Sequence, residues 1–90
     1  MNKVKNIPVQ AAMVVSTIGD ITPIWFRYED EEHHIQKVTI SDVLDRKESH
    51  YCGQEEILFT CKAIVDYVEK VFILRYIVER HKMMFYQMLN

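Results

Sequence analysis

Glycine, proline and cysteine are scarce in this 90-residue sequence, which contains only two of each. With so few glycines and prolines, most turns must be built from Asn, Asp, Ser and charged residues. Two cysteines without a secretion signal indicate reduced thiols rather than a disulfide framework. No apolar run is long enough for a signal-peptide core or a bilayer span, so we expect a cytoplasmic protein without membrane contact.

The sequence also has no excess of basic over acidic residues. The 11 Lys and Arg residues are outnumbered by 13 Asp and Glu, which gives a net charge of −2. This balance argues against non-specific nucleic-acid binding, which depends on neutralising phosphates. Hydrophobic residues at 49% and charged residues at 27% are typical of a folded globular domain. We predict a disordered N-terminus over residues 1–6 and a single domain over residues 7–90.

The fold class depends on the C-terminal stretch 55–89, which contains no Gly or Pro. It is far longer than a typical helix of about 11–12 residues. Its many β-branched and aromatic residues pack well in sheets, and polar clusters divide it at hairpin-like intervals. These features favour three strands, near 56–65, 70–78 and 83–89. The alternative is a C-terminal helix, which would make the fold α+β.

The preceding half also alternates apolar and polar residues. It predicts strands over 9–16 and 22–28 and a third from His33 or His34, with a β-bulge near Gln36 and Lys37. The side chains expected to point inward on the second strand are Ile24, Phe26 and Tyr28. The third strand can extend as far as Leu44, and the rest of residues 42–54 is polar enough to predict a loop. The pattern therefore predicts an all-β fold, a six-stranded antiparallel meander or barrel of SH3-like or OB-like size.

The terminal segment Met83–Leu89 is apolar on both faces. Such a strand is either central in the sheet or an edge that pairs with a second copy. The core position is favoured, and a homodimer through this strand is the alternative.

Cysteine and histidine residues supply the candidates for catalysis and metal binding. His50 lies two residues from Cys52, and Asp42 or Asp45 would have to orient it in a thiol enzyme. The potential zinc ligands are His33, His34, His50, Cys52, Cys61 and His81. None has the spacing of a metal motif, so we expect surface histidines, a buried Cys61, and neither metal nor cofactor.

The candidate binding surface combines Trp25, Arg27, Lys62 and Arg75 on the outer face of the barrel. An aromatic ring among cations offers stacking and phosphate contacts, which single-stranded nucleic acid requires. A protein partner is the other expectation for this face.

Motifs spread along the chain add a resemblance. They are Gly19–Phe26 (G-x-I-x-P-x-x-aromatic), Ile35–Val38 (I-x-x-V), Phe59–Ile64, and Phe72–Tyr76 (F-x-L-R-Y). In this order they resemble a group of short bacterial β-barrel proteins without an established activity. Met83 stands where that group usually has Trp, Phe59 where Tyr is frequent, and Tyr67 where Gly is usual. The resemblance supports strands in the last third and implies no activity.

Taken together, the sequence favours a non-enzymatic small β-barrel that acts as a binding or adaptor module for protein or nucleic acid. Two alternatives remain open. One is a homo-oligomeric structural protein, and the other is a thiol enzyme or hydrolase that uses Cys52 and His50.

Overall fold

A computed structural model describes residues 4–51 and 53–90 as a single all-β unit. Its seven strands are β1 (Val4–Val15), β2 (Ile21–Glu29), β3 (Ile35–Thr39), β4 (Asp42–Tyr51), β5 (Gln54–Val65), β6 (Val68–Ile77) and β7 (Lys82–Met88). All strand pairs are antiparallel, which confirms the predicted fold class. The described residues form no helix, so the α+β alternative is wrong.

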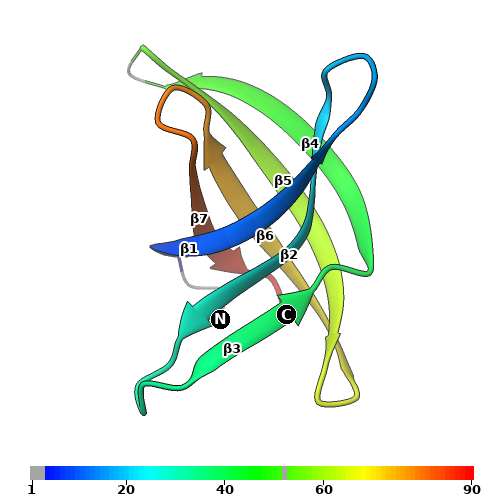
Figure 1. Cartoon of the computed structure of the whole chain (residues 1–90), viewed down its shortest axis with the longest axis vertical. Coiled ribbons are helices and arrows are strands. Elements are labelled where there is room, and N and C mark those ends of the chain that lie inside the picture. Colours follow the sequence, from blue (N-terminus) through cyan, green and yellow to red (C-terminus); the bar gives the residue numbers. More distant parts are fainter. Residues whose placement is uncertain (1–3, 52) are drawn as a thin grey trace.

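The strands follow the order β3-β2-β1-β7-β6-β5-β4 in one sheet. Figure 1 shows this sheet curling into a half-barrel with a concave and a convex side. The first and last strands pair with each other in the middle, so the two edges are β3 and β4, which are consecutive in the chain. Between them, the backbone N–H of Ser41 donates to the carbonyl oxygen of Lys62 on β5 at 2.8 Å. This contact brings the edges together at one end of the half-barrel.

The three C-terminal strands are confirmed, with boundaries within two residues of those predicted. The turn between β5 and β6 has two central residues, Asp66 and Tyr67, with φ of 52° and 66°. Positive φ at both positions is the type I′ geometry that matches strand twist in a two-residue hairpin. The hairpin therefore forms without glycine, although Tyr67 adopts a conformation that usually selects Gly.

A seventh strand replaces most of the loop predicted over residues 42–54. Strand β4 pairs with β5 from Asp42, opposite Lys62, to Tyr51, opposite Gln54. It is an edge strand with most of its described side chains exposed, so no apolar alternation marks it in the sequence. The prediction of six strands was wrong for this reason.

Register shifts occur in four strand pairs, β1–β2, β1–β7, β4–β5 and β6–β7, but not at the predicted position near Gln36 and Lys37. The β2–β3 register runs without interruption from Trp25 to Glu29, whereas the β1–β2 register breaks between Ala12 and Met13. Proline cannot donate to a sheet ladder, which fits the position of Pro23 beside this break. As a result Pro23 is buried and Ile24 is 40% exposed, so the predicted inward position of Ile24 was wrong.

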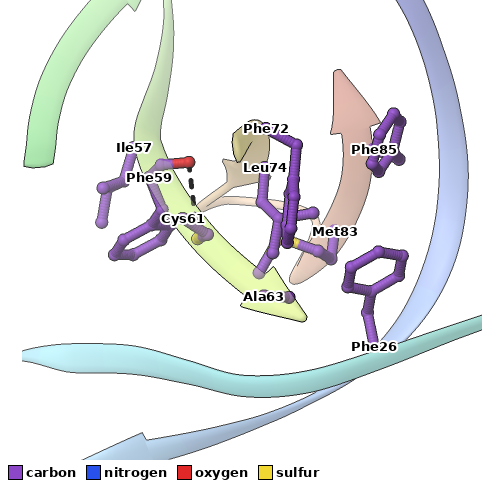
Figure 2. Close-up of a cluster of buried hydrophobic side chains, with 9 residues drawn as sticks. All are labelled: Phe26, Ile57, Phe59, Cys61, Ala63, Phe72, Leu74, Met83 and Phe85. Atoms are coloured by element: carbon purple, nitrogen blue, oxygen red, sulfur yellow. Dashed lines mark hydrogen bonds between the residues drawn. The ribbon is translucent and has the colours of Figure 1, made fainter. Parts of the chain in front are cut away.

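The hydrophobic core occupies the concave side of the sheet (Figure 2). Its buried members are Phe26, Ile57, Phe59, Cys61, Ala63, Phe72, Leu74, Met83 and Phe85. Phe26 comes from β2, and the others come from β5, β6 and β7, which follow one another in the C-terminal part of the chain.

Strand β7 pairs with β1 on one side and β6 on the other. The segment Met83–Leu89 therefore takes the central position in the sheet, and both edges of β7 are occupied within the chain. The homodimer itself stays a prediction. Strand β1 begins at Val4, so residues 4–6 of the predicted disordered N-terminus belong to it. Residues 1–3 lie outside the described part of the chain.

Candidate functional site

A cavity of about 190 Å³ opens on the concave side of the half-barrel. Strands β1, β2, β3, β5, β6 and β7 all contribute side chains to its wall. Most of this wall is apolar, and the cavity borders the core rather than the convex surface. A concave apolar site with a few polar groups is the usual form of a small-molecule pocket.

Three phenylalanines form the floor of the cavity. The rings of Phe26 and Phe72 meet edge to face with centroids 5.5 Å apart. Phe85 lies 5.7 Å from each of them. All three side chains are buried, so packing with one another fixes their positions.

The mouth of the cavity combines exposed apolar surface with positive charge. Ile7 and Tyr28 line it and remain 43% and 37% exposed. Lys5 on β1 is exposed, and Lys70 on β6 is half-buried. In the described part of the chain no Asp or Glu lines the cavity, so Lys5 and Lys70 border an apolar cavity without an opposing carboxylate in that wall.

The two lysines reach the cavity wall in different ways. Lys70 precedes Phe72 by two residues on β6, so alternation places it on the concave side. Lys5 lies where the β1–β7 register shifts between Val4 and Ile7 and Asn6 has φ of 49°, so this irregularity, not alternation, accompanies its position at the cavity wall. Sequence reasoning missed this site because Lys5 fell in the predicted disordered N-terminus and Lys70 in a polar cluster. Lys70, at the end of the inward apolar row of β6, is the sequence signal that identifies part of this site.

Two of the four predicted binding residues do come together on the convex face. The Arg27 guanidinium carbon lies 5.4 Å from the centroid of the Trp25 ring. Lys37, which the sequence analysis did not select, places its Nζ atom 4.9 Å from the same ring. Arg27 Nε also donates to Gln10 Oε1. Strands β2 and β3 thus present an aromatic ring between two cations.

The other two predicted residues lie elsewhere and contact carboxylates. Lys62 Nζ is 3.3 Å from Glu69 Oε1, and Arg75 Nε donates to Glu56 Oε2 at 2.6 Å. Strands β1 and β7 separate Arg75 on β6 from β2 in the sheet. Lys62 lies where the two sheet edges meet, because its carbonyl oxygen accepts from Ser41, two residues after Thr39, the β3 partner of Trp25. The side chains of Lys62 and Arg75 are paired with carboxylates, whereas Arg27 and Lys37 lie over the Trp25 ring.

His50 is exposed on β4, opposite Glu55. Asp45 precedes it by five residues on the same strand, a separation of about 17 Å in extended backbone. Neither Asp45 nor the more distant Asp42 can therefore orient His50 as the thiol-enzyme hypothesis required. Cys52 itself lies outside the described residues, so its role stays a prediction.

Cys61 is a fully buried core residue, as the sequence analysis expected. Its Sγ atom donates to the Phe59 carbonyl oxygen at 3.6 Å, and burial raises the pKa of the thiol to about 12 (Figure 2). A thiol in this state is inert near neutral pH.

Three of the histidines considered as ligands contact polar partners near their own turns. His33 Nδ1 is 2.5 Å from Glu29, His34 Nδ1 is 3.7 Å from Glu32, and His81 Nδ1 is 2.9 Å from the Tyr76 hydroxyl. Over residues 4–51 and 53–90, no three His, Cys, Asp or Glu side chains gather in a metal-binding arrangement.

Comparisons with family models, with curated proteins and with solved structures gave no match. The resemblance to short bacterial β-barrel proteins therefore stays a prediction. Among the described residues, no helix has the length and apolar character needed to cross a membrane.

Proposed function

We propose that this chain is a non-enzymatic binding module whose half-barrel takes up a small apolar ligand in its concave cavity. The observation that carries the proposal is a cavity of about 190 Å³ above a floor of three packed phenylalanines. An apolar cavity of about 150 Å³ is sufficient to bind one benzene molecule. The volume here is thus adequate for a small ligand without rearrangement of the sheet.

The way protein interiors pack favours a ligand-binding cavity over a packing defect at this position. Protein cores have few voids larger than a water molecule, because unfilled space forfeits dispersion contacts. Here the cavity lies beside the buried core, and buried aromatic rings form its floor. A ligand would restore those contacts without competing for hydrogen bonds.

Fluorobenzene tests this proposal, since its ¹⁹F NMR signal reports binding directly and it carries no charge. We expect saturable broadening or displacement of the signal with the wild-type chain. Val38→Phe places extra volume at the cavity wall and should abolish binding, whereas Val14→Phe, at an exposed position, should retain it. Absence of saturable binding, or equal binding by both variants, would contradict the proposal.

A second candidate function is single-stranded nucleic-acid binding on the convex face. It is favoured by Trp25, which has Arg27 and Lys37 within cation–π distance. A stacking ring flanked by cations is what a single-stranded site requires.

Trp25 is the only tryptophan in the chain, so its fluorescence reports on this face alone. Titration with oligo-dT at low salt should quench it, and added salt should reverse the quenching. Lys37→Gln should weaken the effect, and Lys47→Gln, at an exposed position on the edge strand β4, serves as the control. Unchanged fluorescence at low salt would exclude this second function.

A further inference from the structure

We infer that the ligand of the concave cavity is a small amphipathic anion, namely a monocarboxylate with an apolar body of about seven or eight carbon atoms. This inference rests on the proposed function, because it specifies the ligand of the same cavity. Three features of the site support it: the charge at the mouth, the composition of the floor, and the volume.

The charge at the mouth selects an anion. Lys5 and Lys70 come from two strands and, within residues 4–51 and 53–90, are the only charged residues that line the cavity. The neighbouring carboxylate of Glu69 does not offset Lys70, because alternation places it on the other face of β6, where it pairs with Lys62 at 3.3 Å. A carboxylate at the mouth would gain two ammonium partners, whereas a cationic head group would be repelled.

The floor determines how such a ligand would lie. Phe26, Phe72 and Phe85 are 2%, 1% and 8% exposed, whereas Lys5 is among the exposed residues. The apolar body therefore belongs on the phenylalanine floor, and the carboxylate belongs at the mouth beside the lysines. This orientation leaves no polar ligand atom without a partner, which a buried carboxylate would otherwise require.

The volume limits the length of the apolar body. A cavity of about 150 Å³ accommodates the six carbons of benzene, so about 190 Å³ corresponds to about seven or eight carbons. Each methylene that enters the cavity contributes about 0.8 kcal/mol, or about a fourfold gain in affinity. Within a series of straight-chain carboxylates, affinity should rise up to octanoate and then level off.

Isothermal titration with octanoate, octan-1-ol and octylamine tests the inference, because the three share an apolar body and differ in charge. We expect octanoate to bind about tenfold more tightly than octanol, which corresponds to one charge-assisted contact at a partly exposed site. Octylamine should bind most weakly. Equal binding of octanoate and octanol would overturn the inference while leaving the proposed function intact.

The double variant Lys5→Gln/Lys70→Gln should lose the preference for octanoate while keeping its affinity for octanol. Lys62→Gln, which removes a lysine outside the cavity, is the matched control and should keep the preference. A double variant that still prefers octanoate would overturn the role of the lysines. If neither the C8 compounds nor fluorobenzene bind, the proposed function itself fails.

Discussion

Arg75 donates from Nε to Glu56 Oε2 at 2.6 Å, and the two side chains are only 16% and 9% exposed. The pair lies on the opposite face of β5 and β6 from the phenylalanine core, as strand alternation requires. Arg75 also donates from Nη1 to Asn6 Oδ1 on β1 at 3.1 Å. The arginine that the sequence suggested as a binding residue therefore links β1, β5 and β6.

Removal of one partner from this buried pair should be strongly destabilising. Glu56→Ala leaves the Arg75 guanidinium without its carboxylate, and we expect a loss of about 3–5 kcal/mol in the free energy of unfolding. Glu69→Ala removes an exposed partner of Lys62 and should cost at most about 1 kcal/mol. Urea unfolding of both variants measures the difference. Equal losses would show that the Glu56–Arg75 pair has no structural role.

A single substitution in the β5–β6 turn should raise the free energy of unfolding. Tyr67 has φ of 66° and is fully exposed, so it adopts a left-handed conformation without packing contacts to offset it. Tyr67→Gly should raise the unfolding free energy by about 0.5–1 kcal/mol, because relief of left-handed strain exceeds the added entropy of the unfolded chain. Val68→Gly, at a strand position, should lower it. Thermal unfolding distinguishes the two, and a less stable Tyr67→Gly variant would contradict the turn geometry.

The β2–β3 hairpin should loosen at low pH through Asp30. A hydrogen bond from Gln36, together with those from the backbone N–H groups of His34 and Glu32, lowers the pKa of Asp30 below its ordinary value of 3.8. A lowered folded-state pKa stabilises the hairpin above about pH 3.8, and this contribution is lost as pH falls through the lower folded-state value.

Amide hydrogen exchange at His34 and Glu32 measures this effect. Protection should decrease at acid pH in the wild-type chain and remain independent of pH over the same range in Asp30→Asn, which cannot titrate. A wild-type hairpin whose amide protection does not change on acidification would argue against the role assigned to Asp30.

Cys61 should resist alkylation while the chain is folded. Its thiol is buried and its pKa is raised to about 12, so both access and thiolate formation are suppressed. In a Cys52→Ala background, iodoacetamide at pH 8 should label Cys61 only when urea unfolds the chain. Mass spectrometry follows the reaction. Labelling in native buffer at the rate of free cysteine would mean that this part of the core opens readily.

The sequence was sufficient to predict the strands that build the core. Strands β5, β6 and β7 lack Gly and Pro and are rich in β-branched and aromatic residues. Their composition and their two-residue apolar alternation therefore both predict strands. Strand β4 escaped prediction because an edge strand exposed on both faces has no apolar alternation. The bulge beside Pro23 was misplaced because a register shift depends on the partner strand as much as on the residues themselves.

The binding surface was harder to predict than the strands. Alternation correctly placed Trp25 and Arg27 together, because they share one face of one strand. It could not place Lys62 or Arg75 relative to them, since that depends on the pairing of β1 with β7. The cavity was missed for the same reason, because its floor and mouth come from strands that only this long-range pairing assembles.

We propose that the concave cavity, rather than the convex Trp25 face, binds the ligand. NMR titration with fluorobenzene tests it most directly, with the valine methyl groups and the Trp25 indole N–H as reporters. We predict saturable changes at Val9, Val38 and Val65, which line the cavity, with Val14 and the Trp25 indole unchanged. Saturable changes at the Trp25 indole alone, or none at the three cavity valines, would contradict the account.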